Sequence, residues 1–243
     1  SYEGAKVEAV CEVMPYSGGL TRNIVQCLED FGIPLYLSTT VVQIHGTKRL
    51  EGVTIAQVDE RRQPIEETKR YIPCDTLLLS VGLIPENELS RSAGVQINPI
   101  TNGPAVNQYM QTSAPSVFAC GNVVHVNDLV DNVSEESARA GKYAARYAMG
   151  KLNGEQKTVN SITGRNVRYL CPQTVDAAEK DGKVSIYFRV LQPELNVKLV
   201  ARCGDEIIYK HKEFRVNPGE MCNIKFDTAL VTGPVTVDVV KED

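Results

Sequence analysis

The sequence lacks the features that mark nucleic-acid-binding or membrane-spanning proteins. Its 243 residues include no tryptophan, and acidic residues outnumber basic ones, for a formal net charge of −4. Such a charge gives no positive field for nucleic acid or an anionic membrane surface. No apolar run approaches the roughly 20 residues that cross a bilayer, and the first residues do not read as a signal peptide. We therefore expect no nucleic-acid partner and no membrane span.

Close pairs of metal-binding or disulfide-forming residues are also absent. The seven cysteines are scattered and odd in number, and no Cys-x-x-Cys occurs. This disfavours a secreted disulfide framework and a zinc cluster, and favours reduced thiols in a cytoplasmic protein. The three histidines show neither metal-ligand spacing nor a triad pattern. We place His45 and His211 at solvated turn or strand positions. Cys120 is interpreted as an unreactive packing residue in a buried strand.

The first half of the sequence alternates between strand and helix patterns. Residues 7–37 predict a β-α-β unit, in which apolar residues recur at helical spacing and Gly32 ends the helix. Residues 40–70 predict a small antiparallel meander. Residues 76–81 form a continuous apolar run, which is typical of a strand buried on both faces.

Two helices and another strand are expected further along. A short helix is predicted at 86–93 and a buried strand at 117–120. Ser134 has the character of an N-cap, and two acids follow it where the helix dipole favours negative charge. We therefore predict a helix from Glu135 to Met149, ended by a glycine.

The last third of the sequence has a different pattern. Beyond residue 162, short alternations of apolar and polar residues are separated by turn signals such as Asp181-Gly182. Several short strands of this kind predict a small β-sandwich. The polar, patternless stretch at 153–161 indicates a linker.

One motif suggests a ligand. The stretch from Thr112 to Val124 reads Thr-Ser-Ala-Pro-Ser-Val-Phe-Ala-Cys-Gly-Asn-Val-Val. A strand that ends in Gly121 brings backbone amides close to a ligand, because no Cβ blocks the approach. Asn122 adds a side-chain oxygen that can accept a hydrogen bond from a hydroxyl-bearing linker. Taken alone, the motif fits an ordinary strand-to-loop turn equally well.

A second motif gives this stretch a context. It runs from Asp75 to Leu89 and reads Asp-Thr-Leu-Leu-Leu-Ser-Val-Gly-Leu-Ile-Pro-Glu-Asn-Glu-Leu. By itself it fits a buried strand followed by a turn, but the order of elements and motifs resembles the pyridine nucleotide-disulfide oxidoreductase superfamily. The resemblance covers residues 3 to about 150. It implies an α/β fold with partial Rossmann-like FAD/NAD(P)-binding domains. It says nothing of residues 162–243, where the strand pattern alone predicts the small all-β, sandwich-like C-terminal domain. The expected divisions are a partial NAD(P)-binding domain at 1–85, the closing segment of an FAD-binding domain at 86–152, the linker at 153–161 and the sandwich at 162–243.

The resemblance also implies cofactor contacts. An acid that ends the second strand of a dinucleotide domain accepts ribose hydroxyls and repels a 2′-phosphate, so Glu12 favours NAD(H) over NADP. The alternative is an exposed glutamate at a strand end. Asn122 replaces the usual acid after the glycine, which affects flavin tuning more than binding. The loop residues His125 and Asp128 could touch flavin or substrate. The residues implied to contact FAD are Gly121, Asn122, Val123, Val133 and Ser134, and those implied to contact NAD are Glu12 and Gly82.

The residues of both motifs are similar to those in one branch of this superfamily. That branch holds FAD/NAD-dependent oxidoreductases resembling subunits of opine oxidase, sarcosine oxidase and hydrogen cyanide synthase, and partners of anaerobic glycerol-3-phosphate dehydrogenases. It implies hydride transfer from NADH to FAD, with electrons passed to a partner subunit or a small acceptor. Two alternatives stay open: a thioredoxin-reductase-like enzyme whose dithiol lies upstream, and a non-catalytic fragment that docks a partner protein through the β-domain.

The superfamily's glycine fingerprints are missing. No Gly-x-Gly-x-x-Gly occurs in this sequence, although both dinucleotide folds of the superfamily open with one. Val7 falls where the second strand of the NAD domain should begin. We therefore expect a C-terminal fragment with weak or no binding of either cofactor, because the amides that cradle their phosphates are absent.

Overall fold

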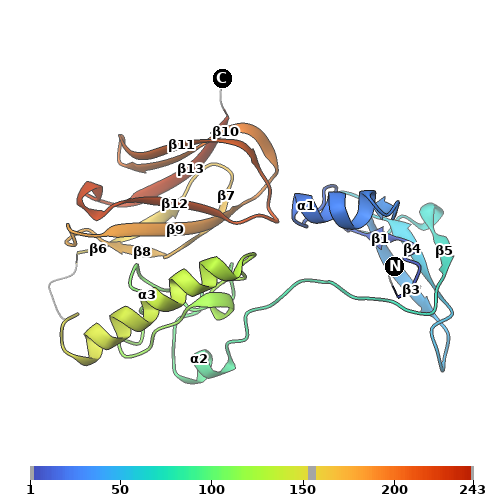
Figure 1. Ribbon diagram of the computed structural model, residues 1–243, viewed down its shortest axis with the longest axis horizontal. Coiled ribbons are helices and arrows are strands. Elements are labelled where there is room, and N and C mark those ends of the chain that lie inside the picture. Colours follow the sequence, from blue (N-terminus) through green and yellow to red (C-terminus); the bar gives the residue numbers. More distant parts are fainter. Residues whose placement is uncertain (1–2, 153–156, 242–243) are drawn as a thin grey trace. The chain divides into compact units, whose positions relative to one another are not determined.

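The computed structural model describes residues 3–152 and 157–241 (Figure 1). The chain divides into two compact units, Ser1–Val81 and Gly82–Asp243. Each unit has its own sheets, and the larger hydrophobic clusters belong to the second unit. No helix within the described ranges is long and apolar enough to cross a membrane.

The first unit combines a short parallel strand pair with an antiparallel sheet. Its elements are β1 (Val10–Cys11), α1 (Thr21–Asn23), a π-helical turn (Ile24–Glu29), β2 (Leu35–Tyr36), β3 (Thr39–His45), β4 (Gly52–Gln57), a 3-10 turn (Glu66–Thr68) and β5 (Arg70–Pro73). β1 and β2 pair in parallel around the helical segment, so the expected β-α-β unit is present. The order β3-β4-β5, antiparallel throughout, confirms the expected meander.

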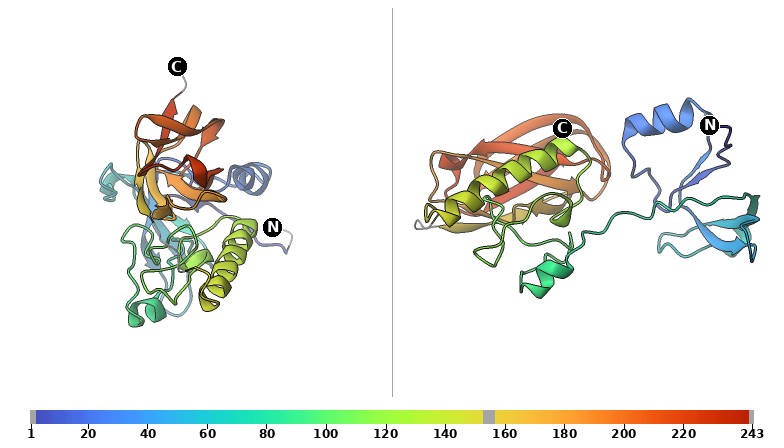
Figure 2. Two further views of the ribbon diagram at one scale, coloured as in Figure 1. Left: turned by 90° about the vertical axis from the view of Figure 1, so that its left-hand side faces the viewer. Right: turned by 60° about the horizontal axis from the view of Figure 1, so that its bottom comes forward.

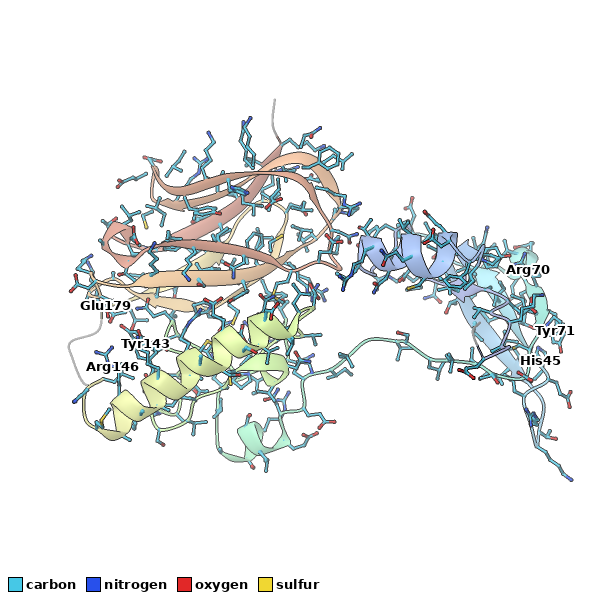
Figure 3. All side chains as sticks on the ribbon, in the orientation of Figure 1. His45, Arg70, Tyr71, Tyr143, Arg146 and Glu179 are labelled. Carbon is cyan, nitrogen blue, oxygen red and sulfur yellow. The ribbon has the colours of Figure 1, made fainter. Side chains whose placement is uncertain are left out.

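Aromatic packing orders the meander (Figure 3). The ring of Tyr71 lies across Gly52, where a Cβ would come within 2.3 Å of the tyrosine oxygen. His45 meets the same ring edge-on at 5.2 Å between centroids, and its Nε2 lies 2.7 Å from the hydroxyl of Thr54. His45 is thus a partly buried, paired strand residue, whereas His211 keeps the expected solvated position on its strand, with 57% of its side chain exposed.

The expected buried strand at residues 76–81 does not form. The stretch is irregular, and Leu78, Leu79 and Val81 are 88%, 73% and 91% exposed. A strand buried on both faces needs hydrogen-bonded neighbours as well as covering layers. No strand in the described part of the chain pairs with these residues. The prediction was wrong because an apolar run alone does not supply such neighbours.

The second unit begins with two helices joined by a long loop. Its elements before residue 150 are α2 (Glu88–Ser92), a 3-10 turn (Gly121–Val123) and α3 (Val130–Ala148). The expected helix at 86–93 is therefore present in shortened form. The expected strand at 117–120 is wrong, since Phe118 makes only an isolated bridge to Gln111.

The start of α3 also differs from the prediction. The helix begins at Val130 after the extended residue Leu129, so Ser134 lies within the helix and does not cap it. Glu136 is consequently the seventh helical residue and is completely buried, away from the first turn. The difference arises because the buried stripe of Glu136 and Ala140, not a polar cap, fixes how the helix lies.

The rest of the second unit is the expected β-sandwich. One sheet has the strand order β11-β10-β13-β6-β8, and the facing sheet has the order β12-β9-β7. The strands are β6 (Thr158–Thr163), β7 (Val167–Cys171), β8 (Thr174–Asp176), β9 (Lys183–Val190), β10 (Glu194–Cys203), β11 (Glu206–Val216), β12 (Cys222–Asp227) and β13 (Val235–Lys241). β6 begins inside the stretch 153–161 that was expected to be a linker, and 153–156 lie outside the described residues.

Strand β9 is buried on both faces. Its alternate residues Val184, Ile186 and Phe188 enter the core between the two sheets, as their spacing predicts. The opposite face carries Ser185 and Tyr187, which are nevertheless only 2% and 1% exposed. A polar outer face that is buried must be covered by another element of the unit.

That covering element is α3, which lies against the sandwich in Figures 1 and 2. The hydroxyl of Tyr187 donates to a carboxylate oxygen of Glu135 at 3.0 Å, and Ser185 reaches the other oxygen at 3.4 Å. A second hydrophobic cluster joins residues of α3 and its preceding loop to the sandwich, and includes Ala140 of α3 and Cys171 of β7. The structure is therefore of the expected mixed α/β class, and α3 covers the outer face of strand β9 in the sandwich.

Candidate functional site

The glycine turn after residue 120 has a conformation that requires glycine. Gly121 is buried and has φ +70°, in the left-handed region that other residues enter only at a cost. A Cβ at this position would lie 3.1 Å from Cγ1 of Val133 on α3. The backbone N–H of Gly121 donates to Oε2 of Glu136 at 2.9 Å. The turn is thus held against α3 by one hydrogen bond and one close contact.

Two further residues, from other segments, contact the turn. The buried side-chain amide of Asn87 donates to the carbonyl oxygens of Val123 at 2.8 Å and of Asn102 at 2.9 Å. At Gly103 a Cβ would come within 1.9 Å of the carbonyl oxygen of Val124, so the two backbones touch directly. The path of the turn is therefore fixed by groups from three separate segments.

The loop between the turn and α3 has an exposed face. Asn122 is exposed, and its side-chain oxygen accepts the backbone N–H of Asn127 at 3.0 Å. Val123 and Leu129 are 39% and 49% exposed, and Val130 at the first position of α3 is 75% exposed. This face combines backbone polar groups with apolar side chains.

The start of α3 carries no side-chain cap. Leu129 precedes the helix and makes no capping hydrogen bond, which leaves the N–H groups of the first turn without that partner. The only acid in the first turn is Asp131. The resulting positive end of the helix dipole attracts an anion. Ser134, expected beside a ligand at this end, is the fifth helical residue and is exposed.

The structure overturns the expectation for His125 and Asp128. His125 is only 1% exposed and cannot reach a ligand on the loop surface. Asp128 instead forms an ion pair with Arg189 of β9, whose guanidinium also donates to the carbonyl oxygen of Val126 at 3.1 Å. Both residues serve to hold the loop on the sandwich.

His125 belongs to a buried polar cluster. Its Nε2 lies 2.6 Å from Oε1 of Glu136, and its Nδ1 lies 3.3 Å from the hydroxyl of Tyr169 on β7. Burial alone would lower the pKa of His125, but the adjacent sulfur of Cys171 and the carboxylate of Glu136 outweigh it and raise this pKa to about 11. We infer an imidazolium at neutral pH, with both ring N–H groups facing acceptors.

The same cluster has a donor set that a metal could use. The ligand atoms of His125, Glu136 and Cys171 all lie within 4.8 Å of one another. Two ligands bound to one tetrahedral zinc ion stand about 3.3 Å apart, given metal–ligand distances of about 2.05 Å. The separation of 2.6 Å between His125 and Glu136 is shorter and is that of a charged hydrogen bond. The geometry therefore favours direct pairing over shared coordination.

The residues expected to contact NAD lie in different units. Glu12 directly follows β1, at the end of the parallel pair, and its Oε1 accepts the N–H of Met14 at 2.9 Å. Its other oxygen, Oε2, lies 3.7 Å from where a Cβ on Gly18 would stand. Gly82 is exposed, with φ +107°, and a Cβ there would meet nothing within 4 Å. The strand-end glutamate and the open glycine are thus both present, each within its own unit.

Sequence reasoning missed the residues that support the turn. Asn87 and Gly103 lie 34 and 18 residues before Gly121, and no local pattern links them to it. Glu136 was interpreted as a helix-start acid, although it lies three positions after Val133 and four before Ala140, on the same helical face as these apolar residues. A charged residue at a buried helical position implies a specific partner.

Comparison with known proteins gives the chain its family. The family model described as pyridine nucleotide-disulphide oxidoreductase matches residues 5–145, more than half of the chain. That range includes both the strand-end Glu12 and the Gly121 turn with α3.

Individual relatives match over shorter lengths. A "Nitric oxide reductase FlRd-NAD(+) reductase" from Salmonella schwarzengrund (strain CVM19633) is 28% identical over 123 residues, which is 51% of this chain and 29% of the relative. A protein of the same name from Klebsiella pneumoniae is 31% identical over 103 residues, covering 42% of this chain and 24% of the relative. A solved thioredoxin reductase from Gloeobacter violaceus aligns with a TM-score of 0.26 and 16% identity, over 55% of this chain and 41% of that one.

Proposed function

Because the chain belongs to the pyridine nucleotide-disulphide oxidoreductase family, we propose that it supplies NAD-contacting and flavin-contacting parts of an NADH-dependent flavoprotein oxidoreductase. The observation that carries this proposal is the family match over residues 5–145, which contains a glycine-requiring turn packed beside an uncapped helix start. The chain spans less than a third of the length of the curated relatives it matches. The activity, substrates and partners of the whole protein therefore belong to the proposal.

The residues beside the turn fit a flavin dinucleotide. The exposed apolar side chains of Val123, Leu129 and Val130 suit a flat aromatic ring system. The uncapped start of α3 offers N–H groups and a positive dipole end, which stabilise negative charge nearby. When bound, FAD would take a hydride from NADH and pass electrons onward. The role of this chain's residues is to bind and orient it.

The roles of individual residues follow from their existing bonds. The N–H of Gly121 is taken by Glu136, so we assign Gly121 to shaping the turn instead of to donating a hydrogen bond to the cofactor. The side-chain oxygen of Asn122 holds one N–H of its loop and has a second acceptor position for a ribityl hydroxyl. We assign Val133 to packing beside Gly121, and Ser134 to the outer surface of the same helix.

The proposed nicotinamide cofactor is NAD(H). Glu12 lies at the end of a parallel strand pair, where a carboxylate accepts ribose hydroxyls and repels a 2′-phosphate. For Gly82, which is open and has a positive φ, we propose a close backbone approach of a nicotinamide cofactor. The relatives are named NAD(+) reductases, which supports this choice.

The electron acceptor is proposed to be a partner redox protein or a small molecule. The names of the relatives favour an NAD-linked reductase over a thioredoxin-reductase-like dithiol enzyme. All seven cysteines are free, which supports a reducing, cytoplasmic location. The alternative of a purely docking sandwich is weakened, because α3 and its loop occupy one outer face of it.

The test uses the protein expressed from its complete gene. We expect a flavin absorbance spectrum in the purified protein and bleaching of that spectrum on anaerobic addition of NADH. NADPH at the same concentration should bleach it at least tenfold more slowly. A purified protein that holds no flavin even after incubation with FAD, or a bound flavin that NADH does not bleach, would contradict the proposal. Bleaching by NADPH at an equal rate would contradict the assignment of Glu12.

A further inference from the structure

The carboxylate of Glu136 on α3 binds two groups of the loop that precedes this helix. Its Oε2 accepts the N–H of Gly121, and its Oε1 pairs with Nε2 of His125. The side chain is 0% exposed, so both contacts are fully shielded from water. A buried carboxylate is tolerated only when its oxygens are satisfied in this way.

His125 carries the connection on into the sandwich. Its Nδ1 meets the hydroxyl of Tyr169, and the sulfur of Cys171 lies within 4.8 Å of the ligand atoms of both His125 and Glu136. The two sandwich residues are both on β7, and they are 6% and 1% exposed. The rings of His125 and Tyr169 also meet edge-on, with centroids 5.8 Å apart. The chain of contacts therefore runs from the glycine turn through α3 to β7.

From this geometry we propose that Glu136 and His125 are positioning residues, which lock the Gly121 turn in its ligand-contacting shape by tying it to Tyr169 and Cys171 of the sandwich. The assignment of the turn to flavin rests on the proposed function above. By holding the turn, the C-terminal sandwich also takes part in cofactor binding. Without the carboxylate, the buried N–H of Gly121 loses its acceptor and the imidazolium loses its counter-charge.

The first test measures amide hydrogen exchange in the turn, without any cofactor. In the 243-residue chain, hydrogen exchange of the Gly121 amide is followed by NMR in the wild type and in two variants of the buried acid. Glu136→Ala removes the acceptor, and we expect exchange at Gly121 to accelerate about tenfold or more. Glu136→Gln keeps an acceptor oxygen, so exchange should stay within about threefold of wild type. The Gln variant should, however, lower the pKa of His125, seen by NMR titration of the ring.

Glu135→Gln is the matched control. Glu135 also reaches the sandwich, through Tyr187, but does not contact Gly121. We expect exchange at Gly121 to remain at the wild-type rate in this variant. Equal acceleration in the control and in Glu136→Ala would show a general loosening of α3 and would overturn the inference. If Glu136→Ala does not fold, an unchanged His125 titration in Glu136→Gln would overturn it equally.

The second test uses the protein from the complete gene and measures the dissociation constant of FAD. We expect Glu136→Ala to weaken FAD binding about tenfold or more, with Glu136→Gln and Glu135→Gln both within about threefold of wild type. Wild-type affinity in Glu136→Ala would overturn the inference while the proposed function stands. A wild type that binds no FAD would defeat the proposed function, and the exchange test would still decide whether the buried pair locks the turn.

Discussion

Replacing Gly121 with alanine tests the structural basis of the turn directly. The left-handed φ of +70° costs an alanine about 1–2 kcal/mol relative to glycine. The new Cβ would also stand 3.1 Å from Cγ1 of Val133, which must move by a few tenths of an ångström. We expect Gly121→Ala to lower the free energy of unfolding of the second unit by about 2 kcal/mol. Urea unfolding followed by the helical circular-dichroism signal measures this, because α3, with 19 residues, dominates that signal.

The second unit offers a matched glycine with the opposite expectation. Gly141 lies in the middle of α3, and a Cβ there would meet nothing within 4 Å. Gly141→Ala should therefore stabilise the unit by about 0.5–1 kcal/mol, through helix propensity alone. The double variant Gly121→Ala with Val133→Ala should lose less free energy of unfolding than the sum of the two single variants. The difference is the steric part of the loss, and the cost of the positive φ remains. A loss below about 0.5 kcal/mol in Gly121→Ala, or complete recovery in the double variant, would refute the reasoning.

Three further predictions concern Gly103, His125 and Glu12. Gly103→Ala places a Cβ 1.9 Å from the carbonyl oxygen of Val124, so we expect a loss above about 3 kcal/mol, seen as a collapse of Tm or of soluble yield. The pKa of His125 is raised in the folded state, so its stabilising effect is full below about pH 6.5 and is lost as pH rises toward 11. Unfolding free energy should thus fall between pH 7 and pH 10 more steeply in the wild type than in His125→Gln, and parallel curves would contradict this. Glu12→Ala in the complete protein should raise the KM for NADH and narrow the preference over NADPH about tenfold or more, measured by flavin reduction; an unchanged preference would reject the role of Glu12.

Features that depend on local sequence could be predicted. The meander and the alternation along β9 follow from side-chain periodicity, which the backbone of a strand imposes directly. In each case the residues that decide the structure are neighbours in the chain, so their pattern is visible without the fold.

Features that depend on distant partners could not be predicted. Residues 76–81 have the composition of a buried strand, but a strand also needs a pairing edge, which composition does not reveal. The first residue of α3 is set by packing of its buried stripe, so the favourable cap sequence at Ser134 was misleading. The partners of Glu136 come from residues 11 to 35 positions away, and only the folded chain brings them to one point.

Contacts of the sandwich with α3 and its loop cross the boundary that was expected before residue 162. Tyr187 and Arg189 on the outer face of β9 are polar, and both are bound by acids of the loop and α3. Separated from α3, the sandwich would expose Tyr187, and the buried pair of Glu136 and His125 would face water on the sandwich side. Each part therefore completes the other's polar groups, and the two share a hydrophobic cluster. We expect residues 103–148 and the sandwich to unfold as one cooperative unit, because neither retains a satisfied interior alone.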